Sequence, residues 1–260
     1  MPKPPTKVIY ITLILTALCI LWGGNAFCAK VIKLTSDPYC PLICDPKKEG
    51  KSGYMVDVAR AVFEESGYSV ELYIRPWSRG ILDVRYGKYD GLVGCWKNHA
   101  PDFIFPENEI GKSSAKFYVR KGNPWRFNGI KSLKKVKFGI VQDYDYSDEK
   151  DYIRDNPDKV DAVAGEDALE RNIKKIMLGR IDVIEDNETV VQYTLKKLGL
   201  RDQIIEAGTD KKPDYYFIAF SPKNPKSKKY AKILSDGIMK LRQTGKLGEI
   251  LDKYGIKDWK

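Results

Sequence analysis

The sequence has one histidine, few cysteines and a single long apolar run, and these shortages exclude several classes of protein. His99 is the only histidine in 260 residues, which excludes a metal site built from several histidines. The only apolar segment near membrane length spans residues 8–22, which excludes a protein with several membrane spans. No G-x4-G-K-[ST] loop is present, so any ATPase that works with this chain is a separate subunit.

The composition is that of a globular protein. Hydrophobic residues make up 43% of the chain, enough to form a core, and the 21 glycines and 14 prolines are ordinary numbers. The length suits one large domain or two lobes of about 100 residues each.

The N-terminus has the order of a secretory signal peptide. Lysines precede the apolar run 8–22, and small, turn-forming residues follow it. We expect residues 1–29 to be the signal, with cleavage after Ala26 or Ala29. An uncleaved membrane anchor is the alternative, but the run is shorter than the roughly 20 residues that span a bilayer. The mature protein is therefore expected in the periplasm.

The formal net charge of +10 raises the question of nucleic-acid binding. The densest basic run, residues 223–232, has no accompanying aromatic-basic nucleic-acid motif, and export also argues against that role. We interpret the run as a solvated helix face and expect no nucleic-acid partner.

The cysteine pattern suits an oxidising compartment. Cys40 and Cys44 lie in a loop at C-x3-C spacing, and in an exported protein they can form a short disulfide. Zinc is the alternative, but too few ligands accompany them, and we expect neither a metal nor a cofactor. Cys95 is expected to be a small buried hydrophobic residue at the end of a strand.

Hydrophobic periodicity predicts two successive series of alternating strands and helices. The first series comprises strands 31–35, 69–74 and 91–94 with helices 54–66 and 78–86. The second comprises strands 136–141, 160–163 and 181–184 with helices 148–156, 168–178 and 188–198. Extended segments 115–120 and 215–220 follow the two series, and helices 227–244 and 247–254 end the chain. This order predicts parallel sheets covered by helices.

Two α/β lobes joined by two extended crossings predict a hinged molecule. We place lobe 1 at residues 30–117 and 218–260, and lobe 2, inserted into it, at residues 118–217. Ligands of such folds bind where parallel strands end, here in the cleft between the lobes. Closure of the hinge around the ligand is the expected motion.

The order of short motifs resembles the bacterial extracellular solute-binding proteins of family 3, the polar amino-acid type. The resemblance covers essentially the whole mature chain. It rests on GYMVDVA at 53–59, PW at 76–77, GKYDG at 87–91, DFIF at 102–105, GRIDV at 179–183, AFSPKNP at 219–225 and GKLGEIL at 245–251. It implies a two-lobed, periplasmic-binding-protein-like (type II) fold with a ligand in the cleft.

The resemblance also implies a set of ligand residues, which this chain keeps only in part. In typical members an arginine clamps the ligand carboxylate, and here His99 stands at that place. Histidine lacks the planar, two-pronged guanidinium group and the permanent charge of arginine. Asp186, or Glu185 as the alternative, matches the acid that takes the ligand ammonium. The ligand-binding residues predicted on this basis are Trp77, Arg79, Trp96, Lys97, His99, Tyr144, Tyr146 and Asp186.

These departures remodel the carboxylate side of the expected site and keep its amine side. The aromatic residues with Asp186 could therefore hold a cation or a more apolar amine. The leading hypothesis is a monomeric solute-binding protein, not an enzyme, that delivers a small polar, amine-bearing solute to an ABC permease. The alternatives are a periplasmic enzyme of dehydratase or lyase type on the same scaffold, and an extracytoplasmic sensor.

Overall fold

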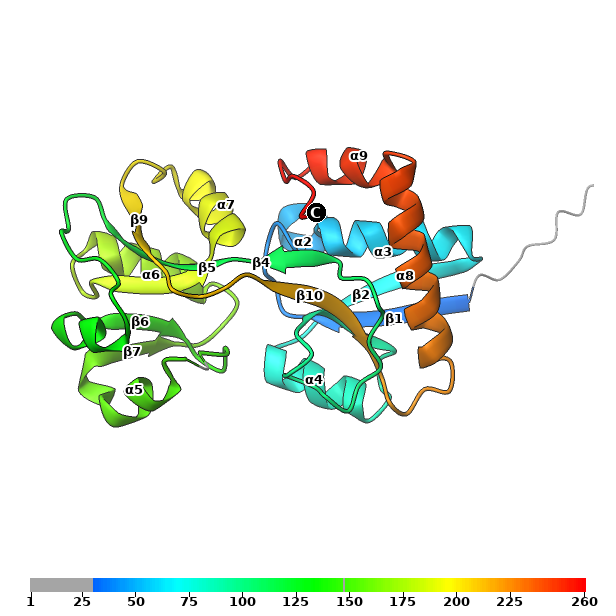
Figure 1. The fold of residues 1–260 in the computed structure, drawn as a ribbon, viewed down its shortest axis with the longest axis horizontal. Helices are drawn as coiled ribbons and strands as arrows, with labels where there is room; N and C mark the ends of the chain where they lie inside the picture. The colour runs from blue at the N-terminus through cyan, green and yellow to red at the C-terminus, as the bar shows by residue number, and fades with distance from the viewer. Residues whose placement is uncertain (1–29, 147) are drawn as a thin grey trace, which may run out of the picture. The chain divides into compact units, whose positions relative to one another are not determined.

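The computed structural model describes residues 30–146 and 148–260, and residues 31–260 form one compact unit (Figure 1). The predicted signal peptide lies outside the described residues. Within the described part, no helix has the length and apolar character needed to cross a bilayer.

The first lobe is built on a five-stranded sheet in the order β2-β1-β3-β10-β4. Its strands are β1 (Lys30–Ser36), β2 (Tyr68–Ile74), β3 (Gly91–Cys95), β4 (Gly111–Ser113) and β10 (Asp214–Phe220). Its helices are α2 (Pro46–Glu49), α3 (Tyr54–Glu65), α4 (Trp77–Arg85), α8 (Ser227–Gln243) and α9 (Lys246–Asp252). Successive residues of β3 point to opposite faces, so Val93 packs in the core with α3, α8 and α9, and Leu92 in the smaller core with α4.

The second lobe has a sheet in the order β7-β6-β8-β5-β9. Its strands are β5 (Ala115–Arg120), β6 (Phe138–Val141), β7 (Val160–Val163), β8 (Val183–Asn187) and β9 (Ile204–Gly208). Its α-helices are α5 (Lys150–Asp155), α6 (Ala168–Met177) and α7 (Glu188–Leu198), with 3-10 turns at Ile130–Lys135 and Pro157–Lys159. The same alternation sends Phe117 to the core of α5 and Tyr118 to the core of α6 and α7.

The two-lobed fold is confirmed, and each predicted parallel sheet also contains antiparallel strands. Strand β1 is parallel to β3, and β6 is parallel to both β7 and β8, whereas β10 and β5 are antiparallel to their neighbours. These two antiparallel strands are the extended segments that cross between the lobes, and each enters its sheet from the opposite direction. Strands β4 and β9 had no expected counterpart, because they are short and their pairing partners are distant in sequence.

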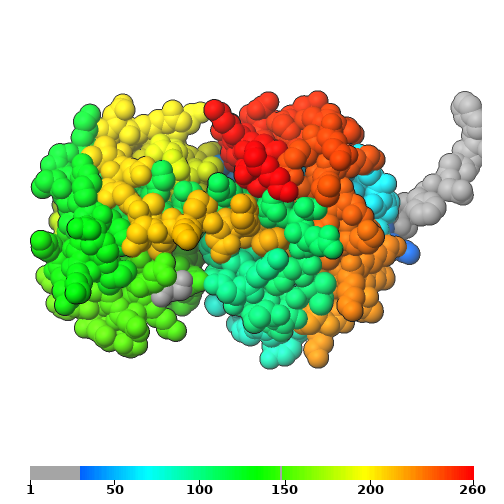
Figure 2. Space-filling view, viewed as in Figure 1, coloured from blue at the N-terminus to red at the C-terminus, as the bar shows by residue number. Residues whose placement is uncertain are grey.

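The crossings lie slightly earlier in the chain than the predicted boundaries at 117/118 and 217/218. Ala115 already pairs with Asn187 of β8 in the second lobe, and Asp214 already pairs with Ser113 of β4 in the first. On the face shown in Figure 2, the gold residues that lead into β10 lie over the boundary between the lobes. Strands β1 and β3 of one lobe and β6 and β8 of the other all end near this boundary.

Candidate functional site

A cavity of about 250 Å³ lies between the two lobes, where β1, β3, β6 and β8 end. Its aromatic lining residues are Tyr39, Trp77, Trp96, Tyr144, Tyr146 and Tyr216. Its acids are Asp37, Asp145, Asp148, Glu185, Asp186 and Asp214, and its basic side chains are His99, Lys211 and Lys212. This volume is below the range of sites that hold drug-sized ligands, so the cavity suits a solute of about amino-acid size.

Two aspartates face each other across the cleft, and each is bonded to a tyrosine of the opposite lobe. Tyr39 of the first lobe donates to Asp186 Oδ1 of the second, and Tyr144 of the second lobe donates to Asp37 Oδ2 of the first at 2.8 Å. The two tyrosine rings lie edge to face, 6.0 Å apart. Asp186 Oδ1 also accepts from the backbone N–H of Asn187 at 2.7 Å. The pairs therefore join the lobes at the wall of the cavity.

Burial raises the pKa of both aspartates to about 6, since it disfavours the ionised form more than their hydrogen bonds favour it. Both carboxylates remain largely ionised at neutral pH. Neither forms an ion pair with a lysine, arginine or histidine in the described residues. The cavity therefore offers two negative groups whose counter-charge has to come from a ligand.

His99 occupies an aromatic corner of the cavity. Its ring lies 4.8 Å from the ring of Trp96 and 5.9 Å from that of Trp77. Its Nε2 is 2.5 Å from Asp145 Oδ2 of the other lobe, and its buried Nδ1 has no hydrogen-bond partner in the described structure. At the position where the resemblance implied a carboxylate clamp, this chain thus carries an imidazole already bonded to an acid.

Lys211 lies between two buried glutamates beside the cavity. Its Nζ is 2.6 Å from Glu185 Oε1 and 2.9 Å from Glu149 Oε2. Burial, followed by the nearby Glu149 charge, raises the pKa of Glu185 to about 8. One ammonium group therefore serves two acids.

Six of the eight predicted ligand residues line the cavity, and Arg79 and Lys97 do not. Each helical residue turns by about 100°, so Arg79, two residues after Trp77 on α4, points away into solvent. Lys97 is exposed, with its Nζ 4.7 Å over the ring of Phe217.

Four residues important to this arrangement were not among the predicted ligand residues: Asp37, Tyr39, Glu149 and Lys211. Asp37 and Tyr39 follow the end of β1, the first strand of the sheet, and that position was a usable signal. Lys211 lies on the connection from β9 to β10, and no sequence pattern brings it to the buried acids.

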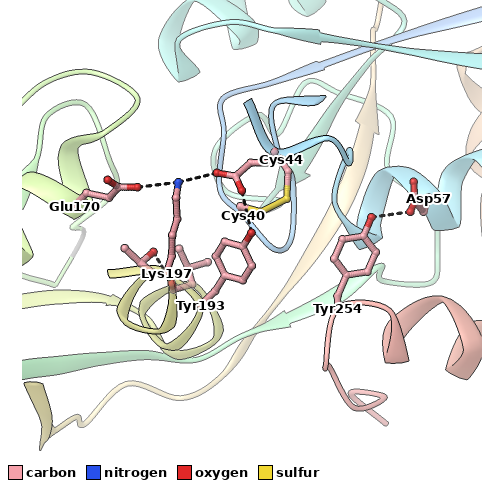
Figure 3. Close-up of a disulfide and its surroundings, with 10 residues drawn as sticks. Cys40, Cys44, Asp57, Glu170, Tyr193, Lys197 and Tyr254 are labelled. Carbon is pink, nitrogen blue, oxygen red and sulfur yellow. Dashed lines mark hydrogen bonds and ion pairs between the residues drawn. A yellow bond between two sulfur atoms is a disulfide. The ribbon is translucent and has the colours of Figure 1, made fainter. Parts of the chain in front are cut away.

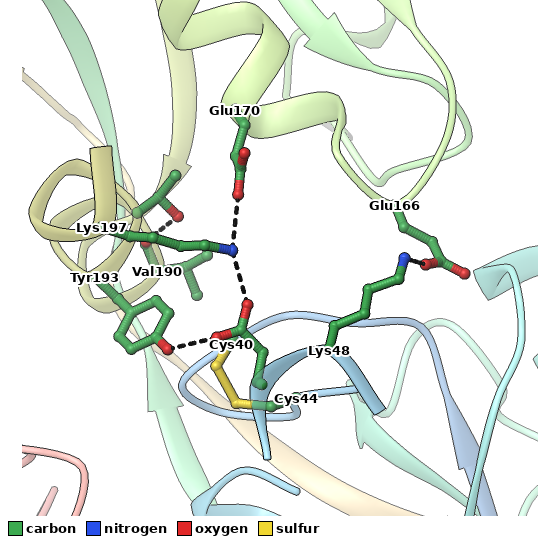
Figure 4. Close-up of polar contacts among 10 residues, drawn as sticks. Cys40, Cys44, Lys48, Glu166, Glu170, Val190, Tyr193 and Lys197 are labelled. Atoms are coloured by element: carbon green, nitrogen blue, oxygen red, sulfur yellow. Dashed lines mark hydrogen bonds and ion pairs between the residues drawn. A yellow bond between two sulfur atoms is a disulfide. The ribbon is translucent and has the colours of Figure 1, made fainter. Parts of the chain in front are cut away.

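A second group of contacts joins the lobes beside the predicted disulfide, which the structure contains between Cys40 and Cys44. Cys95, the free thiol of the described residues, is buried, as expected. Glu49 of α2 accepts from Lys197 of α7 at 2.7 Å and from the Tyr193 hydroxyl at 3.0 Å, and Lys197 also lies 3.1 Å from Glu170 (Figure 3). Lys48 donates to Glu166 of the second lobe (Figure 4). We call these contacts the latch: Lys48 and Glu49 with Glu166, Glu170, Tyr193 and Lys197.

Breaking the latch should weaken solute binding indirectly. It joins the lobes at a place apart from the aspartate–tyrosine pairs, so Glu49→Gln is expected to lower the closed fraction. Partly exposed ion pairs contribute up to about 1 kcal/mol, so the dissociation constant should rise by up to about fivefold. Glu65→Gln is the matched control, because Glu65 pairs with Lys240 and Lys246 within the first lobe. Equal affinities of the two variants, measured by calorimetry, would show that the latch has no part in closure.

The family model for bacterial extracellular solute-binding proteins, family 3, matches residues 32–257. No sequence of a curated protein matches the chain significantly.

Solved structures resemble the fold at low sequence identity. One, described for glutathione import via GshT and the cystine ABC importer TcyBC of Streptococcus mutans, has TM-score 0.71 and 20% identity, over 86% of this chain and 94% of that one. The amino-acid ABC transporter substrate-binding protein AbpA of Streptococcus pneumoniae, bound to L-arginine, has TM-score 0.67 and 19% identity, over 88% and 97%. A histidine kinase sensor domain has TM-score 0.69 and 20% identity, over 88% and 98%.

Proposed function

The chain belongs to the bacterial extracellular solute-binding proteins of family 3, and we propose that it captures a small amine-bearing solute and delivers it to an ABC permease. In this proposal the N-terminal segment directs export, the mature protein acts as a monomer in the periplasm, and the permease lies in the inner membrane. The solute binds between the lobes, and the closed molecule docks on the permease.

The observation that carries the proposal is the pair of aspartates in an aromatic cavity. Asp37 and Asp186 face the cavity from opposite lobes, each held by a tyrosine of the other. A cation within reach of both carboxylates compensates their charge, and the surrounding aromatic rings attract it through their faces. Because the two acids come from different lobes, one ammonium group bound to both favours closure.

Two other functions have some support. The bonded pair His99–Asp145 lines the cavity and could transfer a proton, as an enzyme would require. Turnover of a bound solute that is lost in His99→Ala would favour that role. A sensor role is suggested by the structural similarity to a histidine kinase sensor domain, but that similarity shows only the fold. In the leading proposal the chain releases its solute unchanged.

A thermal-shift screen of the mature protein, refolded free of ligand, tests the proposal. The panel contains amino acids, amines, betaines, polyamines, short peptides and organic acids. A solute at about 100 times its dissociation constant adds roughly 2.7 kcal/mol to the unfolding free energy, which raises the melting temperature by several degrees. The proposal predicts such a shift with amine-bearing members. A shift with organic acids alone, or with nothing in the panel, would contradict it.

Loss of an aromatic wall should weaken binding of any solute that the screen identifies. We expect Trp96→Ala and Tyr144→Ala each to raise the dissociation constant by about tenfold or more, because each removes a ring that contacts the cation. Tyr86→Ala is the control, since Tyr86 is 75% exposed outside the cavity. Unchanged calorimetric affinity in both cavity variants would exclude an aromatic cation site.

A further inference from the structure

The interior of the site holds more acid than base. Four of the carboxylates at or beside the cavity are buried or half-buried, those of Asp37, Glu149, Glu185 and Asp186, and the half-buried ammonium among them is that of Lys211. Burying a carboxylate without a counter-charge is costly, so a site with this excess is completed by added positive charge. One ammonium group at Asp37 and Asp186 leaves Glu149 and Glu185 with the single ammonium group of Lys211 between them.

The less completely hydrogen-bonded of these two acids is Glu185. Its side chain is 2% exposed, and its Oε2 has no hydrogen-bond partner in the described structure. Glu149 also has an unpartnered oxygen, Oε1, while both glutamates share Lys211. The charged groups that face Glu185 are Lys211, Glu149 and Asp186, with Asp148 3.9 Å from Lys211 on the exposed side. Glu185 is therefore a second acid in the wall of the same cavity, and it becomes a negative pole when a bound ammonium group displaces its proton.

The lining offers little to a carboxylate. No arginine lines the cavity in the described residues, and Lys211 is already held by two acids. His99 is bonded to Asp145 through Nε2. Lys212 is the remaining basic side chain, and it is exposed.

On the basis of the proposed function, we propose that the solute is a dication without a carboxylate, such as an alkyl diamine. One ammonium group binds between Asp37 and Asp186, and the other binds at Glu185 Oε2. Glu185 and Asp186 are neighbours on β8, and neighbouring side chains of a strand point to opposite faces. The ligand therefore passes around the end of the strand, which favours a flexible alkyl chain over a rigid ring.

Calorimetry on the ligand-free mature protein tests the second pole directly. The probes are 1,4-diaminobutane, 1,5-diaminopentane, the matched monoamine butylamine, and L-ornithine. We expect a diamine to bind at least about tenfold more tightly than butylamine, the effect of one buried charge contact. In Glu185→Gln the ratio of diamine to monoamine affinity should fall towards one, while Glu65→Gln should keep the wild-type ratio. A thermal melt of each variant checks folding.

Proton release gives an independent readout. At pH 7 the raised pKa of Glu185 keeps that group largely protonated in the free protein, so diamine binding should release up to about one proton. Titrations in buffers of different ionisation enthalpy measure this release, which Glu185→Gln should reduce to the small release from Asp37 and Asp186.

The outcomes separate this inference from the proposed function. Equal binding of diamine and monoamine, or an unchanged affinity ratio in Glu185→Gln, would overturn the inference that the solute is a dication. The proposed capture of an amine-bearing solute would still stand. Binding of ornithine without binding of diamines would overturn the inference that the solute lacks a carboxylate. If neither these probes nor any amine in the thermal-shift panel bound, the proposed function would be contradicted as well.

Discussion

The substitution Asp186→Asn should nearly abolish solute binding. Asp186 is 7% exposed and lies at the cleft with Tyr39 and the backbone N–H of Asn187 as its hydrogen-bond partners. Asp186→Asn keeps the shape but removes the charge that compensates a buried ammonium. Loss of one partner of such a buried pair costs about 2–5 kcal/mol, so the dissociation constant should rise by about thirtyfold to several thousandfold.

Calorimetry with the tightest amine from the thermal-shift screen measures this effect. Asp236→Asn is the matched control, because Asp236 pairs with Lys232 on the exposed surface of α8 and should bind as the wild type does. If Asp186→Asn retained wild-type affinity while remaining folded, the ammonium would not be bound at this carboxylate.

Protonation of the cavity acids should stabilise the free protein and weaken the complex. The pKa values of Asp37 and Asp186 are about 6 in the folded protein, against 3.8 for an ordinary aspartate. The folded state therefore binds more protons between about pH 4 and 6, and the contribution of these groups to stability falls as pH rises through that window. Glu185, with a pKa of about 8, extends the decline to about pH 8.

A bound cation reverses this dependence, because it favours the ionised carboxylates. An alkyl amine remains protonated throughout this range. Below pH 6 the affinity should fall by up to about tenfold per pH unit for each aspartate that must lose a proton. Melting curves with and without the amine at pH 5 and pH 7.5 measure the difference. A ligand-induced shift that is as large at pH 5 as at pH 7.5 would contradict ion pairing at these aspartates.

Most of the fold could be predicted because its signals are local. Amphipathic helices such as α3 and α7 end at Glu65 and Leu198, with Ser66 and Gly199 as their C-caps, and their apolar positions recur at helical spacing. What sequence reasoning missed depends on pairing between distant segments. Strand β9 is recognisable only beside β5, and the antiparallel entry of β10 follows from the return of the chain to the first lobe.

The site was predictable where strand ends supply it. Trp96, Tyr144 and Asp186 lie at or just after the ends of β3, β6 and β8, strands of two sheets that both end at the cavity. Arg79 was misplaced because the predicted helix began at residue 78, whereas α4 begins at Trp77, so the turn of the helix between these two side chains was not expected. The pairing of Lys211 with Glu149 and Glu185 joins a connecting segment, a helix cap and a strand, and only the folded chain shows it.

Native mass spectrometry tests the central claim most directly, namely that a small cation fills the cleft between Asp37 and Asp186. The protein would be purified without unfolding, and its mass compared with that of a refolded sample and of Asp186→Asn. The account predicts one bound amine of amino-acid size in the first sample, absent from the refolded protein and from the variant. A retained anion, or an amine held equally by Asp186→Asn, would contradict it.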